Sequence, residues 1–388
     1  MDTPNGYNQK IYLLSLFLYN FARVLPHAVL TVILLDKGMT VSEIAMVQSF
    51  YMLAAIIFEF PSGLLTDLLS EKAMYQLSLV LIGISYVLIM VTNTFYLLCL
   101  AWFIYGMSSA SMSGSLDSYF IRRAEDSGQI KHVNVLINHA LLYSGLIGGG
   151  LGSFLYAVFF EHIYLISLFM IALSLFLITF LFHADKRREK TASTEALSEL
   201  MVEFGKIRQQ KCLILIIMMT AVFQIITQLF YQFWQVSFLS RHFSKTYFGL
   251  LYILFQVIAI VSNVLFSRHD FSKSLGRLAA CLGTLMLLSV IVPGKFPFLL
   301  LVVMYLIPFN LYGSQLAVSL QKEAGNQVMA SVISFSGTVS SIVSVISLWV
   351  VGILNDHFPF DYVEAVLILV FLSLSSLLLV KYSAAEKQ

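Results

Sequence analysis

Long apolar stretches alternate with short polar connections along almost the whole chain, as at Thr92-Asn93-Thr94. A helix needs about 20 mostly apolar residues to cross a hydrocarbon core roughly 30 Å thick. The pattern therefore predicts an all-α membrane protein with twelve transmembrane helices. The predicted spans are residues 11–35, 42–67, 73–91, 95–121, 133–159, 162–183, 212–239, 246–267, 275–292, 296–319, 327–354 and 361–380.

The longest hydrophilic segment, residues 184–211, divides these spans into two groups of six. The predicted domains are thus an N-terminal half (1–183), a linker (184–211) and a C-terminal half (212–388). Within the linker, Leu197, Leu200 and Phe204 recur on one side of a helix, with acidic residues elsewhere. We expect either an amphipathic helix at the membrane surface or a soluble docking helix.

Composition agrees with immersion in lipid and excludes several classes of protein. Only 11% of the residues are charged, against about 25% in a soluble domain. The net charge of +2 and the lack of a basic stripe exclude nucleic acid as a partner. The 3 cysteines and 8 histidines show no metal-ligand spacing and no catalytic cluster, so we expect no metal, no cofactor and no enzymatic activity.

The basic residues predict the orientation of the spans. If both termini lie on one side, that side holds 18 of the 23 lysines and arginines, the opposite side holds 4, and Arg23 lies within a span. Positive loops stay in the cytoplasm. We therefore expect a multi-pass protein of the cell membrane, either a bacterial inner membrane or a plasma membrane, with both termini cytoplasmic.

The connection after the second span carries a motif of glycine, aspartate and a basic residue at Gly63, Asp67 and Lys72. This motif resembles the loop motif of the major facilitator superfamily, although Leu68 and Glu71 depart from it. The resemblance implies a fold of two six-helix halves and a latch that closes the cytoplasmic face. The residues placed in this latch are Gly63, Asp67, Lys72, Arg122 and Arg123.

Two further stretches narrow the resemblance. The stretch from Glu59 to Gly63 reads Glu-Phe-Pro-Ser-Gly, and the fourth span contains Gly106 and then Ser113-Gly114-Ser-Leu-Asp117. Together they resemble the branch of the superfamily that holds many bacterial drug/proton antiporter-like exporters. The fifth span adds Gly145, Gly148, Gly149, Gly150 and Gly152. These glycines predict close helix packing, with an antiporter motif as the alternative.

The first span carries polar residues on one face. Asn20, Arg23 and His27 are spaced i, i+3 and i+7, and Arg23 lies near the middle of the span. In the superfamily, spans one, four, seven and ten line the central path, so this face is expected to bind substrate. Two interpretations of Arg23 stay open: it holds an anionic substrate group, or it forms a permanent ion pair with Glu59 or Asp117.

Carboxylates within spans are candidates for carrying a proton. A buried carboxylate near an arginine is balanced between desolvation and attraction, so its proton can come and go as exposure changes. Glu59 is the first candidate and Asp117 the second, with His27 as a possible relay.

The second half offers neutral polar and aromatic residues. Gln224, Gln228, Tyr231 and Gln235 share one face of span seven, and span ten adds Tyr305 and Asn310. Such groups suit a bulky amphiphile, although Tyr231 could instead belong to an interfacial aromatic belt.

These observations predict a monomeric secondary transporter that couples protons to the export of small amphiphilic or drug-like molecules. One alternative is a carrier of a specific anionic metabolite, or a lipid-like anion, recognised through Arg23. A membrane sensor or structural protein is an alternative of another class, but it gives no reason for charged residues at bilayer depth.

Overall fold

A computed structural model describes residues 4–113, 115–126, 130–183 and 210–385. These residues are helical throughout apart from short turns, and they contain no strand. The prediction of an all-α membrane protein is confirmed. Ten helical stretches are long and apolar enough to cross a membrane, and a bent pair makes an eleventh.

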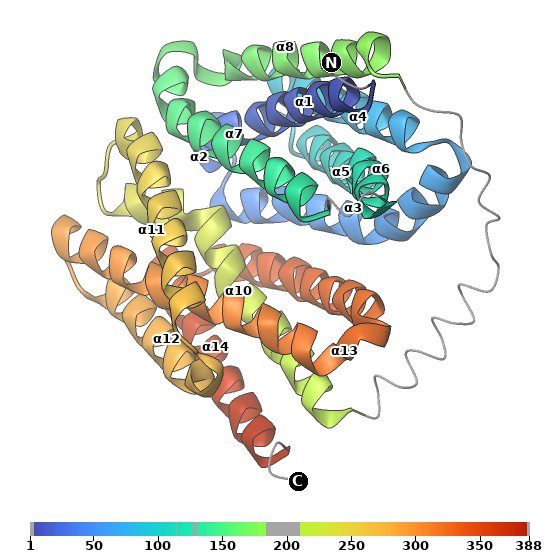
Figure 1. The fold of residues 1–388 in the computed structure, drawn as a ribbon. Helices are drawn as coiled ribbons and strands as arrows, with labels where there is room; N and C mark the ends of the chain where they lie inside the picture. Colours follow the sequence, from blue (N-terminus) through green and yellow to red (C-terminus); the bar gives the residue numbers. More distant parts are fainter. Residues whose placement is uncertain (1–3, 114, 127–129, 184–209, 386–388) are drawn as a thin grey trace. The chain divides into compact units, whose positions relative to one another are not determined.

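The helices before the linker are shown in blue to green in Figure 1. They are α1 (Pro4–His27), α2 (Leu30–Asp36), α3 (Val41–Leu68), α4 (Glu71–Val91), α5 (Phe95–Met112), α6 (Leu116–Asp126), α7 (Ile130–Phe159), η1 (Phe160–His162), α8 (Ile163–Phe176) and the π-helical turn η2 (Leu177–Leu181).

The helices after the linker run from yellow-green to red in Figure 1. They are α10 (Lys211–Ser240), η3 (Lys245–Tyr247), α11 (Phe248–Arg268), η4 (Ser272–Ser274), α12 (Leu275–Ile291), α13 (Lys295–Asn355) and α14 (Phe360–Ala385).

Four predicted spans differ from the helices observed. The first span is broken: α1 and α2 are separate helices bent by 49°. The predicted fourth span, 95–121, is divided into α5 and α6. Spans ten and eleven lie in one continuous helix, α13, whose apolar stretches are Lys295–Ala324 and Phe335–Asn355. The predicted linker helix falls at residues 184–209, outside the described residues.

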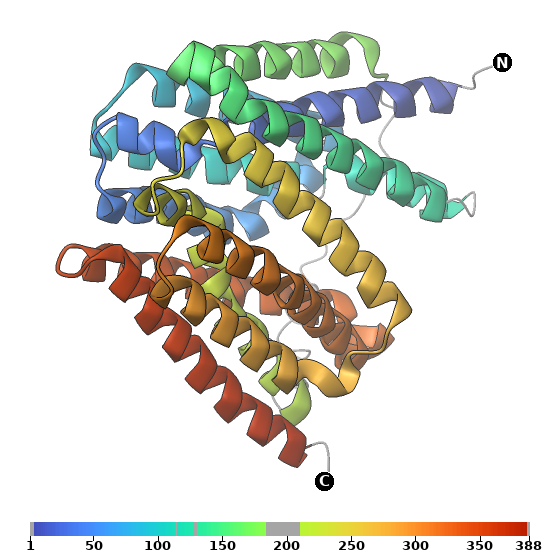
Figure 2. The ribbon, with the colours of Figure 1, turned by 90° about the vertical axis from the view of Figure 1, so that its left-hand side faces the viewer.

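The chain groups into two compact units, and residues Ser244–Ile253 belong to the first unit although they follow the linker. In this unit α1 packs against α7 and α8, while α5 packs against α3 and α4; α1 and α7 run side by side in Figures 1 and 2. In the second unit α10 packs against α13 and α14, and α12 packs against the same two helices.

Glycines let α7 approach its neighbours. A Cβ atom at Gly152 would lie 2.3 Å from the carbonyl oxygen of Leu25, and one at Gly148 would lie 3.1 Å from that of Phe21. Gly149 faces the ring of Tyr252 at the start of α11. The prediction that these glycines serve close packing is confirmed, because side chains there would collide with backbone and rings.

Candidate functional site

The polar face of α1 begins at Asn20, whose side-chain amide is held in place by hydrogen bonds. Asn20 is buried, and its Nδ2 atom donates hydrogen bonds to the carbonyl oxygen of Leu141 (3.0 Å) and to Oγ of Ser144 (2.8 Å) on α7. Its Oδ1 atom accepts from Nη2 of Arg23 at 3.1 Å. Asn20 is therefore anchored by α7, and it in turn orients the guanidinium group of Arg23.

Arg23 is half-buried among aromatic hydroxyl groups rather than carboxylates. Four tyrosines, one each from α1, α3, α4 and α5, interact with it electrostatically: Tyr19, Tyr51, Tyr86 and Tyr105. The ring of Tyr105 packs edge-on against Tyr51 (5.1 Å between centroids) and Tyr86 (5.9 Å). Among the side chains that the structure describes, no carboxylate forms an ion pair with Arg23.

The hydrogen-bond partner of Asp117 is a tyrosine, and not Arg23 as one interpretation of the sequence had it. The hydroxyl of Tyr12, on α1, donates a hydrogen bond to Oδ1 of Asp117, and the Tyr12 ring stacks on Phe120. Tyr12 precedes Arg23 by eleven residues, which is about 16 Å along a helix. The interpretation of Arg23 as the ion-pair partner of Asp117 is wrong, because Asp117 lies three turns away.

Glu59 lies on α3, eight residues beyond Tyr51, so its Cα atom is about 12 Å further along the helix. The side chains of Glu59, Gly63, Asp67 and Arg122 lie outside the described residues, and their proposed roles stay predictions.

The other two latch candidates bond within the first unit. Nζ of Lys72 donates to the carbonyl oxygens of Phe182 (2.8 Å) and Thr179 (3.3 Å), at the end of η2. Arg123 donates to the hydroxyl of Tyr119 one turn earlier on α6. The Lys72 contacts attach the start of α4 to the end of η2, whereas the Arg123 contact stays within α6.

His27 is the last residue of α1, where the first span breaks. It is half-buried and follows Pro26, and α2 resumes at Leu30. The polar face that begins at Asn20 therefore ends at a helix terminus.

Gln48 on α3 was not singled out in the sequence. Its side chain is only 2% exposed, and neither Nε2 nor Oε1 has a hydrogen-bond partner. Tyr51, one of the tyrosines around Arg23, is one turn further along the same helix. A buried amide with no partner costs about 1–3 kcal/mol, so Gln48 is a candidate to bind a ligand.

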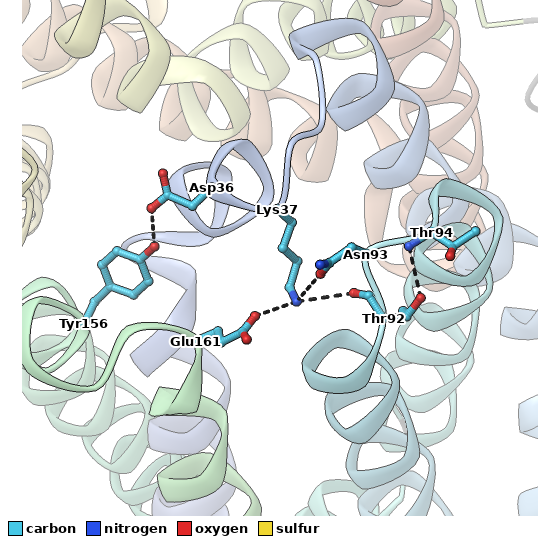
Figure 3. Close-up of polar contacts among 7 residues, drawn as sticks. All are labelled: Asp36, Lys37, Thr92, Asn93, Thr94, Tyr156 and Glu161. Carbon is cyan, nitrogen blue, oxygen red and sulfur yellow. Dashed lines mark hydrogen bonds and ion pairs between the residues drawn. The ribbon is translucent and has the colours of Figure 1, made fainter.

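A polar cluster joins the ends of several helices in the first unit (Figure 3). Nζ of Lys37, at the end of α2, donates to Glu161 (2.6 Å), Asn93 (3.0 Å) and the carbonyl oxygen of Thr92 (3.2 Å). The Lys37 side chain is only 4% exposed. This cluster, on the predicted extracellular side, fixes the outer end of α2 against the α4–α5 and α7–α8 connections.

Asp36 extends the contacts of α2. It accepts a hydrogen bond from the hydroxyl of Tyr156 on α7 and forms an ion pair with Lys245 at 2.6 Å. Lys245 belongs to η3, within the first unit.

The candidates on α10 lie in different environments. Gln235 is buried, and Gln228 is buried with Nε2 bonded to Oγ of Ser344 (3.1 Å). Gln224 is half-buried, whereas Tyr231 is 51% exposed. The predicted polar face of α10 thus contains two buried glutamines, Gln228 and Gln235, and one exposed tyrosine, Tyr231.

On α13, Tyr305 is buried and packs edge-on against Phe230, at 6.1 Å between ring centroids. Asn310 donates to the carbonyl oxygen of Leu306 on its own helix at 2.7 Å.

One carboxylate of the second unit, Glu364, is not among the residues predicted from the sequence. Glu364, one turn inside α14, accepts a hydrogen bond from Ser237 at 3.4 Å and interacts electrostatically with Tyr305. Its position near the start of an apolar run, next to Asp361, is the signal that could have identified it. The second half therefore has a half-buried acid, near one end of a span.

Comparison with solved structures finds the same fold in transporters of several kinds. The chain is similar to a mutant form of the nucleoside transporter NupG, with a TM-score of 0.79 and 14% identity over 98% of this chain and 99% of that one. It is similar to a bacterial homolog of the human lysosomal transporter Spinster (0.76, 10% identity, 100% and 98% covered). It is also similar to a D-xylose-proton symporter (0.72, 14% identity, 96% and 97% covered).

No curated protein matches the sequence significantly. The sequence profile of the Major Facilitator Superfamily matches residues 12–348, which is most of the chain. Profile and fold agree on a multi-span transporter of small molecules and not an enzyme. They do not assign the chain to the antiporter branch of that superfamily. The chain belongs to the major facilitator superfamily.

Proposed function

We propose that this protein is a secondary transporter whose first half binds the anionic group of a small organic substrate through Arg23. The observation that carries the proposal is the surroundings of Arg23, which include one amide and four tyrosines, with no carboxylate partner among the described side chains. A charged group at bilayer depth is costly and calls for a partner. A substrate carboxylate or phosphate would supply it.

The geometry of the neighbouring groups favours an anion. A guanidinium group has five N–H donors in a planar fork that fits a carboxylate or a phosphate, and Asn20 accepts from one of its nitrogens. The buried amide of Gln48 offers both a donor and an acceptor to polar groups elsewhere on the same ligand.

One structural neighbour supports this class of ligand. A solved POT family transporter with the same fold is described as a complex with 5-aminolevulinic acid, a small carboxylic acid (TM-score 0.76, 14% identity). We propose that this chain transports such a molecule by alternating access, in the cell membrane, as a monomer with both termini in the cytoplasm.

The test uses the purified full chain and small carboxylic acids, among them 5-aminolevulinic acid, each paired with its methyl ester, which lacks the carboxylate charge. We expect an acid to raise the midpoint of thermal unfolding while its ester does not, because the charge is what Arg23 binds. Arg23→Gln should weaken binding by about ten- to a hundredfold, the cost of losing a charged hydrogen-bond donor.

Arg277→Gln is the matched control, because Arg277 is exposed on α12 and bonds Ser274 on its own segment. The proposal fails if acid and ester bind equally well, or if Arg23→Gln binds the acid as tightly as the unaltered protein does.

A second candidate is proton-coupled export of amphiphilic or drug-like molecules, as in the antiporter branch that the motifs resemble. Its support is the cluster of packed aromatic rings in the second unit, where Phe230 packs against Phe309 (5.5 Å) and Tyr305 (6.1 Å). Tight binding of neutral or cationic amphiphiles that survives Arg23→Gln would favour this candidate over the anion carrier.

A further inference from the structure

The first span breaks beside the proposed anion site, and a proline explains part of the break. Pro26 is next to the last residue of α1 and has no amide hydrogen, so the carbonyl oxygen of Ala22, four residues earlier, loses its usual helical donor. After it the hydrogen bonding changes, because the amide of Val29 donates to the carbonyl oxygen of Pro26 at 3.1 Å. The helix axes differ by 49° across this point.

A tyrosine from another helix replaces the missing donor. The hydroxyl of Tyr86, on α4, donates a hydrogen bond to the carbonyl oxygen of Ala22 at 3.4 Å. Both residues are buried, Ala22 completely and Tyr86 to within 1% of full burial. Without this bond the carbonyl group would be unsatisfied in a dry interior, at a cost comparable to a lost hydrogen bond.

The ring of Tyr86 is held in place from two sides. It packs edge-on against Tyr164 of α8 at 5.0 Å and against Tyr105 of α5 at 5.9 Å. Because the ring cannot move without disturbing both neighbours, the hydroxyl has a fixed position relative to α4, α5 and α8.

The carbonyl group of Ala22 and the backbone nitrogen of Arg23 belong to the same planar peptide unit. A donor that fixes the carbonyl of Ala22 therefore fixes the plane from which the Arg23 side chain starts. The other side of the break is fixed as well, since Lys37 anchors the far end of α2 in the cluster of Figure 3. The bend thus has a support on each side.

We propose that Tyr86 is a positioning residue that replaces the amide hydrogen absent from Pro26 and thereby sets the place of the Arg23 guanidinium group. The contribution to substrate binding rests on the proposed function of Arg23; the contribution to the backbone does not.

The test is a double-mutant cycle between Tyr86→Phe and Pro26→Ala in the full chain. Phenylalanine keeps the packed ring and removes the hydroxyl, whereas alanine at 26 restores an amide donor to the Ala22 carbonyl. In the unaltered background, Tyr86→Phe should lower the midpoint of thermal unfolding. In the Pro26→Ala background the same change should have almost no effect, because the carbonyl then has its own donor.

A second measurement detects a change in the position of the Arg23 side chain in the absence of substrate. The rate at which phenylglyoxal modifies each arginine is followed by peptide mass spectrometry, with exposed Arg277 as the internal reference. We expect Tyr86→Phe to change the rate at Arg23 by about fivefold, the factor that one hydrogen bond is worth. Pro26→Ala should remove this change. Tyr164→Phe is the control, because it deletes a neighbouring hydroxyl and leaves the Ala22 carbonyl bonded.

The proposal is overturned if Tyr86→Phe has equal effects with proline and with alanine at position 26, or if the labelling of Arg23 stays constant throughout the cycle. The outcome is independent of the proposed function. Coupling between the two positions, together with unchanged acid binding in Arg23→Gln, would retain the positioning role of Tyr86 and remove the anion site.

Discussion

Arg23 illustrates how a charge can be kept inside an apolar helix with no carboxylate partner among the described side chains. Tyrosine hydroxyls are neutral, so they surround the guanidinium group with polar atoms and add no second charge that must itself be desolvated. The arrangement leaves guanidinium donors available to a ligand, since Asn20 is its one hydrogen-bond acceptor among the described side chains. A permanent ion pair would instead occupy the planar fork.

Gln48 gives a prediction in which stability and binding change in opposite directions. Removing a buried amide that has no partner should stabilise the empty protein, because its desolvation cost disappears. We therefore expect Gln48→Leu to raise the midpoint of thermal unfolding without ligand, while it weakens binding of the acid by about fivefold or more. Both effects can be measured in one series of thermal unfolding experiments with increasing ligand.

Gln228→Leu is the matched control for Gln48→Leu, because the buried amide of Gln228 is bonded to Ser344. That change should lower the midpoint, because Ser344 loses one of its two hydrogen bonds and Gln232 loses an acceptor. If Gln48→Leu is destabilising to the same extent, the amide of Gln48 has an internal partner and is no ligand group.

The sequence identified some residues of the candidate site and missed others for a physical reason. Asn20 and Arg23 are recognisable because polar side chains are rare in an apolar span and their spacing places them on one face. Tyr51, Tyr86 and Tyr105 have no such signal. An isolated tyrosine in an apolar helix can serve core packing or ligand binding, and its sequence does not distinguish the two. That these tyrosines, from three helices, gather around Arg23 is decided by the tertiary fold.

At the scale of the helix, the apolar pattern predicted where helices run better than where they break. The fourth span is interrupted where Ser115 competes with helical bonding; Oγ of Ser115 donates to the carbonyl oxygen of Met112 at 2.6 Å. Conversely, α13 continues through Gln321-Lys322-Glu323-Ala324. All four residues have high helix propensity although three of them are polar, and no proline interrupts them.

The glycines of α7 give a prediction about packing between helices. Gly152→Ala would place a Cβ atom 2.3 Å from the backbone oxygen of Leu25, so α1 and α7 would have to separate. We expect a loss of about 1–3 kcal/mol in the free energy of unfolding, the usual cost of overpacking. The midpoint of thermal unfolding of the purified protein measures it.

Gly83→Ala is the control for this effect. Gly83 also lies inside a helix, but a Cβ atom added there would have no neighbouring atom within 4 Å. Alanine there should stabilise the protein by about 0.5–1 kcal/mol, because it lowers the entropy of the unfolded chain. Equal responses at positions 83 and 152 would contradict the role of Gly152 in close packing.

At the scale of the whole molecule, the surface agrees with a lipid environment. Large apolar side chains are widely exposed, among them Phe169 (64%) and Phe180 (65%). In water such a surface would drive aggregation, whereas in a bilayer it faces acyl chains. The sequence could predict this because hydropathy is summed over whole helices. The substrate depends on a few side chains, and hydropathy carries no information on them.

Proton coupling is the property of the whole transporter that the sequence predicts most specifically. In proteoliposomes with a trapped pH indicator, substrate movement should change the internal pH if a carboxylate binds and releases a proton in each cycle. We expect Glu59→Gln to abolish the pH change and Asp117→Asn to reduce it, with substrate binding retained in both. Asp270→Asn, which alters an exposed carboxylate in a loop, should leave the signal intact. A Glu59→Gln protein that still moves protons would remove Glu59 as the carrier, and loss of the signal in Asp117→Asn alone would transfer that role to the carboxylate bonded by Tyr12.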